Sequence, residues 1–183
     1  MKTKDLVIAG MFTALIAVLG LLPPISIPGI PVPFTFQNLG YILAGCLLGR
    51  KLGGLSVLIF IILVAIGLPV LSGGRGGIAL FFGPTGGYIL SFPIVAYLIG
   101  LFVERMQAPK VWQVFVINAL IGALLCNLIG GIFMGLNLKQ DLFIALKSVI
   151  VFIPGDCIKG LIAAVLAVKL RNIPSIQKSL RMH

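Results

Sequence analysis

The sequence is poor in the side chains that enzymes use for acid–base and metal chemistry. It has four acidic residues and one histidine, His183, at its last position. Its three cysteines, Cys46, Cys126 and Cys157, stand alone within apolar segments, so no metal-ligand spacing, CxxC motif or disulfide framework is present. We therefore expect no metal site and no enzymatic activity, and we expect the cysteines to be small buried side chains.

Nucleotide-binding motifs are missing as well. The glycines around Arg75 match neither the Walker pattern nor, in their context, the dinucleotide fingerprint. Any ATP-driven cycle would need another subunit.

Polar segments are short. The sequence is 60% hydrophobic and 10% charged, with a mean hydropathy of +1.20, far from the roughly half-apolar mix of soluble domains. At about 20 residues per helical span, the chain predicts an all-α integral membrane protein with six transmembrane helices in one domain, residues 1–183. The expected spans are 6–22, 38–48, 54–68, 84–102, 111–134 and 154–170, followed by a basic tail, 171–183.

The net charge of +10 raises the possibility of nucleic-acid binding, but the basic residues flank the predicted spans and line no groove. Six spans place ten of the fourteen on one side, so the positive-inside rule predicts cytoplasmic N- and C-termini. The ten are Lys2, Lys4, Arg50, Lys51, Arg105, Lys110, Lys169, Arg171, Lys178 and Arg181.

One glycine-rich stretch interrupts the lipid-like sequence between residues 72 and 88. Such a backbone is tolerated at a membrane only against protein or around a ligand. We interpret it as a lid that carries Arg75, followed by an apolar cover and a turn. The proposed lid residues are Gly73, Gly74, Gly76, Gly77, Phe81 and Phe82.

Two charges, Asp156 and Lys159, lie at the outer end of the last expected span or at its kink. Their spacing places them on one helical face. A charge at membrane depth costs about 2.5 to 3.5 kcal/mol on insertion scales, so such residues face a cavity or each other. A purely structural pair is the alternative, although desolvation makes it a poor source of stability. Asp156 can accept from ligand N–H groups, and Lys159 or Arg75 can neutralise a ligand carboxylate.

Further polar residues are candidates for the same site. Gln37 and Asn38 suit an amide or ureido group, or they form an ordinary helix start with Asn38 as its cap. Tyr41 is a third candidate. Tyr88 is either a site residue or an interfacial aromatic anchor.

The first span carries small residues that allow another helix to approach closely, Gly10, Thr13, Ala14 and Ala17. Packing within this chain is the alternative.

Taken together, three motifs resemble the BioY family of biotin-specific substrate-binding (S) components of energy-coupling-factor (ECF) vitamin transporters. They are PVPFTFQ at 31–37, GGRGG at 73–77 with GPTGGY at 83–88, and PGDCIK at 154–159. The resemblance covers the whole chain.

The resemblance implies a six-helix S-component fold in the plasma membrane of a prokaryotic cell. It implies that the chain captures biotin near the outer face, with Arg75, Asp156 and Lys159 binding the ligand or organising the site. It implies no cofactor, because ATP is used only by partners, a transmembrane T component and two ATPases. The small residues of the first helix then dock the T component. The alternatives are an ion-coupled stand-alone carrier and an S component for another vitamin.

Overall fold

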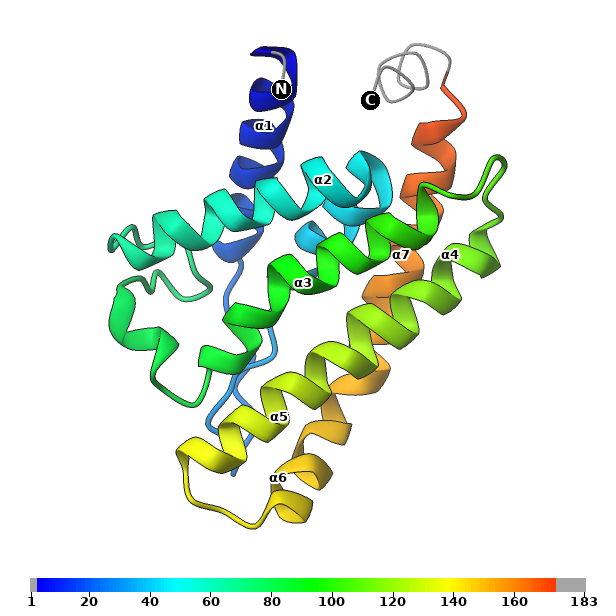
Figure 1. The fold of residues 1–183 in the computed structure, drawn as a ribbon. Coiled ribbons are helices and arrows are strands. Elements are labelled where there is room, and N and C mark those ends of the chain that lie inside the picture. Colours follow the sequence, from blue (N-terminus) through cyan, green and yellow to red (C-terminus); the bar gives the residue numbers. More distant parts are fainter. Residues whose placement is uncertain (1–2, 174–183) are drawn as a thin grey trace.

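The computed structural model describes residues 3–173. Within that range the chain is helical and has no strands beyond two isolated β-bridges, which confirms the predicted all-α class (Figure 1). The α-helices are α1 Thr3–Gly20, α2 Gln37–Ala65, α3 Gly86–Val103, α4 Val111–Ile117, α5 Cys126–Asn137, α6 Leu142–Val149 and α7 Ile153–Arg171. Three shorter segments join them, the 3-10 helices η1 Ile78–Phe81 and η3 Ile150–Phe152 and the π-helix η2 Asn118–Leu125.

Five helical stretches in the described range are long and apolar enough to cross a membrane. They are Thr3–Gly20, Gln37–Ala65, Gly86–Val103, Val111–Asn137 and Leu142–Arg171. The fourth joins α4, η2 and α5, and the fifth joins α6, η3 and α7. The two expected spans 38–48 and 54–68 both fall largely in α2, which ends at Ala65.

Helix α2 is divided by a sharp kink at Gly49, whose φ of 75° and ψ of −176° suit only glycine. Beyond the kink the chain doubles back (Figure 1). A Cβ built on Gly53 would lie 2.9 Å from the carbonyl oxygen of Ala44, although nine residues of straight helix would separate the two by about 13 Å. The single helix therefore contains two segments that pack against each other.

The C-terminal end of α3 holds the kink in place. The Glu104 carboxylate accepts a hydrogen bond from the Arg50 backbone N–H at 2.9 Å and pairs with the Arg50 Nε at 2.9 Å. Gly100 allows close approach, because a Cβ there would clash with the backbone of Gly49 and Arg50. Glu104 thus satisfies an N–H group that the kink removes from the helical ladder.

Pro154 shapes the start of α7. Because proline cannot donate a backbone hydrogen bond, the preceding turn tightens into the 3-10 segment η3, and the chain enters α7 with Pro154 in its first turn. Asp156 lies in the first turn of α7, as expected from its distance to Pro154.

The start of α6 is capped by a side chain. The Asp141 carboxylate accepts from the backbone N–H groups of Phe143 and Ile144.

The connecting segments 21–36 and 66–85 meet at one end of the helix bundle, together with the starts of α2, α3 and α7 (Figure 1, lower half). Five prolines keep the first segment non-helical, and a β-bridge joins Ile25 to Phe34.

Helix α1 packs chiefly on α2. Cys46 and Cys126 are buried, as expected, and Cys157 is half-buried.

Candidate functional site: a pocket between the loops and helix α7

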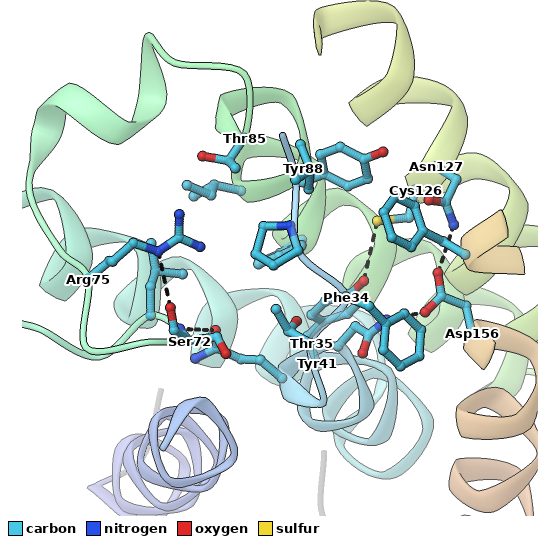
Figure 2. Close-up of a pocket in the computed structure, with 18 residues that line it drawn as sticks. Phe34, Thr35, Tyr41, Ser72, Arg75, Thr85, Tyr88, Cys126, Asn127 and Asp156 are labelled. Atoms are coloured by element: carbon cyan, nitrogen blue, oxygen red, sulfur yellow. Dashed lines mark hydrogen bonds between the residues drawn. The ribbon is translucent and has the colours of Figure 1, made fainter. Parts of the chain in front are cut away.

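A pocket of about 640 Å³, including its open mouth, lies where the two connecting segments meet the helix bundle. Its wall comes from the segment around Phe34, the start of α2, the glycine-rich turn, the first turns of α3, and α5 and α7. Arg75 lies at one end and Asp156 at the other, with mostly apolar side chains between them (Figure 2). This size and composition are typical of small-molecule sites.

Three polar side chains converge on the buried carboxylate of Asp156. Its Oδ1 accepts from the Asn38 amide at 2.6 Å and from the Lys159 ammonium at 2.8 Å. Its Oδ2 accepts from the Asn127 amide at 2.7 Å. Donors from α2, α5 and α7 thus hold this carboxylate at the pocket wall.

Lys159 uses all its donors within the protein. Besides Asp156, its Nζ donates to the Asn38 Oδ1 at 2.8 Å and to the Thr35 carbonyl oxygen at 2.7 Å. The same nitrogen lies 3.4 Å from the centre of the Phe34 ring. An ammonium has three N–H groups, so Lys159 has none left for a ligand, and its side chain is not part of the pocket wall. It ties the segment 21–36 to α2 and α7.

Close packing at Gly155 supports this arrangement. A Cβ on Gly155 would lie 2.5 Å from the Phe34 ring. The ring therefore rests directly on the first turn of α7, between Phe152 and Lys159. The motif PGDCIK thus contains a helix start, a glycine against which an aromatic ring packs, and a buried ion pair.

Arg75 sits in a tight, ordered turn. Leu71 and Arg75 exchange both backbone hydrogen bonds, at 2.9 and 3.2 Å, and Gly73 and Gly74 between them have positive φ. The Arg75 Nε donates to the Ser72 carbonyl oxygen at 3.1 Å. Its terminal nitrogens make no hydrogen bond within the described residues and point into the pocket (Figure 2). Of the two cations expected near the site, Arg75 is the one with donors to spare.

Gln37 is a buried joint between three parts of the chain. Its Nε2 donates to the carbonyl oxygens of Ile16 in α1, at 3.1 Å, and Val70, at 2.8 Å. Its Oε1 accepts from the Ser72 backbone N–H at 3.2 Å. Gly20 leaves room for this side chain, since a Cβ there would lie 2.5 Å from Nε2. Gln37 lines the pocket, but its amide is already used to position the arginine turn.

The two predicted tyrosines both line the pocket. Tyr41 is fully buried, stacks on Phe92 with ring centres 4.5 Å apart, and places its hydroxyl 3.3 Å from the Cys126 sulfur. The Tyr88 ring lies over Gly130, and its hydroxyl is enclosed without a hydrogen-bond partner among the described residues.

The proposed lid residues do not form one surface. Phe81 is buried and Phe82 is exposed, and neither belongs to the pocket wall. Gly76 and Gly77 lead out of the arginine turn. A Cβ on Gly76 would clash with the Leu68 carbonyl, and Gly77 has a φ of 110°. These glycines are required for the path of the backbone.

The small residues of α1 divide between two faces. Gly10 and Ala14 are exposed and Ala17 is half-buried. Thr13 is buried, and its hydroxyl lies within hydrogen-bonding distance of the carbonyl oxygens of Ala9 and Ser56. Thr13 thus belongs to the contact with α2, whereas Gly10 and Ala14 are free.

Sequence reasoning missed Asn127, Ser72 and the contact between Phe34 and Lys159. Asn127 carried a signal, because an amide in an apolar span needs a partner. The role of Ser72 rests on its backbone, which accepts from Arg75 and donates to Gln37, and no residue type announces that.

Comparison with known proteins agrees with this picture. The model of the BioY family matches residues 1–175. The biotin transporter BioY of Lactococcus lactis is 42% identical over 174 residues, 93% of this chain and 92% of that one. A probable biotin transporter BioY of Bacillus subtilis is 38% identical over 184 residues, 98% and 97% of the two chains. A crystal structure of the S-component for biotin from an ECF-type ABC transporter superposes with a TM-score of 0.93 at 38% identity, covering 99% of this chain and all of that one. On these grounds the chain belongs to the BioY family.

Proposed function

We propose that this chain is the membrane-embedded, biotin-binding S component of an ECF-type ABC transporter, which captures biotin at the outer face for ATP-driven uptake by its partners. The observation that carries the proposal is the polarity of the pocket. A cation with unused donors lies at one end, a carboxylate and amide cluster lies at the other, and apolar side chains lie between (Figure 2).

Biotin has the complementary polarity. Its bicyclic head carries a ureido group, and an aliphatic tail separates the head from a carboxylate. Asp156, Asn38 and Asn127 supply acceptors and donors of the kind that a ureido group needs, and Arg75 matches a carboxylate with two parallel N–H groups. Lys159 instead orders the site, because its donors are all used.

The remaining predicted site residues take supporting roles. Gln37 positions the arginine turn, and Tyr41 and Tyr88 form apolar walls for the bicyclic head. Gly73 and Gly74 shape the turn that carries Arg75, and Gly76 and Gly77, with Phe81 and Phe82, lie in the connection from that turn to α3.

In the membrane we expect six crossings and cytoplasmic termini. The kink at Gly49 divides α2 into two segments, and we expect each segment to be one crossing. The start of α1 and the end of α7 then lie on one side, as their positions at the same end of the bundle support (Figure 1). The basic residues of the connections at that end fit the cytoplasmic side of a plasma membrane.

The partners in this proposal are a transmembrane T component and two ATPase subunits. The exposed small residues Gly10 and Ala14 give the T component a place where helices approach closely. Only 28% of α1 is buried within the chain, the smallest share among the five long stretches of the described range, so this helix has the most free surface for a partner.

Calorimetric titration of the detergent-purified chain with biotin tests the proposal, with thiamine and riboflavin as competitors. We expect saturable biotin binding that neither competitor displaces. Displacement by another vitamin would reassign the substrate, and no saturable response to biotin would overturn the proposal. Uptake by liposomes that contain this chain alone, abolished by collapsing an ion gradient, would indicate an ion-coupled carrier instead.

A further inference from the structure

Asn127 stands out among the pocket residues because half of its amide is unused. It lies in α5, is 3% exposed, and lines the pocket next to Asp156 (Figure 2). An amide has a donor end and an acceptor end. In a buried position both ends need partners, since an unsatisfied polar group loses its hydrogen bonds to water without replacement.

The surroundings fix which way this amide points. Its Nδ2 donates to two acceptors, the Ala123 carbonyl oxygen at 3.0 Å and the Asp156 Oδ2 at 2.7 Å. Neither acceptor carries a hydrogen to share with an oxygen in that place. Rotating the amide by half a turn would bring Oδ1 against a carboxylate and a carbonyl, so the nitrogen must stay where it is.

The Oδ1 atom of Asn127 therefore remains an acceptor without a donor. No backbone or side-chain group of residues 3–173 donates to it. Unlike the enclosed hydroxyl of Tyr88, this oxygen keeps contact with the pocket space.

The other acceptors at this end of the pocket are more occupied. The Asp156 Oδ1 already accepts from Asn38 and Lys159, and its Oδ2 accepts from Asn127. The Asn38 Oδ1 accepts from Lys159. A ligand with an N–H group thus finds one unengaged neutral acceptor, fixed in place by the carboxylate beside it.

We infer that the Asn127 side-chain oxygen accepts a hydrogen bond from one ureido N–H of the ligand, which makes Asn127 a specificity-determining residue for cyclic ureas. The inference rests on the proposed function. Asp156 then has two roles, since it holds Asn127 in the accepting orientation as well as facing the pocket.

A thermodynamic cycle separates this role from mere support of Asp156. Calorimetry would compare the wild-type chain and Asn127→Ala with three ligands: biotin and the two biotin derivatives methylated at one or the other ureido nitrogen. We expect Asn127→Ala to weaken biotin binding about 10-fold or more, the effect of leaving a buried hydrogen bond unmade. For one of the two methylated ligands the same substitution should cause no further loss, because that N–H is already gone.

An equal loss for all three ligands would overturn the inference, since a residue that only supports Asp156 affects each ligand alike. Asn127→Ser provides a second variant in case the first fails to fold, because a hydroxyl can still donate to the Ala123 carbonyl. Serine lacks the amide oxygen, so it should show the same dependence on ligand methylation.

Asn118→Ala is the matched control. Asn118 is a buried amide one segment earlier, where it donates to the Gly160 carbonyl oxygen at 2.9 Å and accepts from the Cys46 thiol at 3.2 Å, outside the pocket wall. Its loss should change the affinity for the three ligands by one common factor. If the wild-type chain shows no saturable biotin binding, the proposed function fails. If it binds biotin but the cycle shows no coupling, only the inference about Asn127 fails.

Discussion

Arg75 and Lys159 are two cations close to one pocket, but they differ in how many of their hydrogen-bond donors are already used. Lys159 has three acceptors and an aromatic ring around its ammonium. The Arg75 guanidinium has one hydrogen-bond partner among residues 3–173, the carbonyl oxygen of Ser72. A carboxylate that enters the pocket can therefore pair with Arg75 without displacing a hydrogen bond, whereas pairing with Lys159 would break one.

Esterification of the ligand distinguishes the two cations. We expect Arg75→Gln to weaken the binding of biotin about 10- to 100-fold, the usual effect of a hydrogen bond to a charged group, and to leave the affinity for biotin methyl ester nearly unchanged. Lys159→Met should weaken both ligands by a similar factor, because it disorders the site. Competitive titration measures both affinities.

Arg105→Gln is the control for charge, because Arg105 is an exposed arginine in the turn after α3, outside the pocket wall. It should alter neither affinity. If Arg75→Gln weakened the ester as much as the acid, the assignment of Arg75 to the ligand carboxylate would be wrong.

At the scale of elements, helix α2 owes its shape to one glycine. Gly49 has a conformation that other residues rarely adopt, and a Cβ there would lie 2.8 Å from the Glu104 Oε2 that accepts from Arg50. The kink brings Gly53 against Ala44 and Gly45. The first half of α2 carries Gln37, Asn38 and Tyr41, so the kink also sets the position of the pocket wall relative to the bundle.

Gly49→Ala should lower the stability of the purified chain. We expect a loss of about 1–3 kcal/mol from the strained backbone, which appears as a lower melting temperature in detergent. Gly54→Ala in the same helix is the control, because its Cβ meets only ordinary contacts with Tyr97, the nearest at 3.4 Å. A melting temperature for Gly49→Ala equal to that of Gly54→Ala would mean that the kink adapts to a side chain.

For the whole molecule, membership of a transporter family confirms the prediction that the chain is not an enzyme. The pocket and helix α1 lie in different regions of the bundle. One end holds the pocket and its loops, whereas α1 lies at the side and packs chiefly on α2 (Figure 1). The residues proposed to bind a partner can therefore be changed without changing the residues proposed to bind the ligand.

Gly10→Trp tests this separation. A Cβ on Gly10 meets nothing within 4 Å. The variant chain should therefore fold normally and bind biotin as the wild-type chain does. The substitution should abolish co-purification with the co-expressed T component and ATPases, because helices can no longer approach closely there. Leu128→Trp, at an exposed position of α5, is the control and should retain the partners. Co-purification of the Gly10 variant at the wild-type level would move the docking surface elsewhere.

The sequence predicts the helical class and the charged residues of the site better than it predicts the hydrogen bonds between them. Apolar runs and prolines mark where helices and loops lie, and a charge at membrane depth is conspicuous. The sequence predicts a break between the spans 38–48 and 54–68, where Arg50, Lys51 and several glycines interrupt the apolar residues. Only the φ of Gly49 identifies the residue at which the chain turns back within one continuous helix. The donor assignments of Lys159 and Asn127 also depend on acceptors that lie 29 to 124 residues away along the chain, and no local pattern reveals which groups meet.

Gln37 joins the regions that the preceding contacts keep apart. Its one amide contacts Ile16 in α1, Val70 after α2 and Ser72 beside the arginine turn. The helix proposed to dock a partner and the turn proposed to bind the ligand carboxylate are thus mechanically linked through a single buried side chain. If α1 slides along α2, either the arginine turn moves with it or a buried amide loses a hydrogen bond, at a cost of about 1–3 kcal/mol.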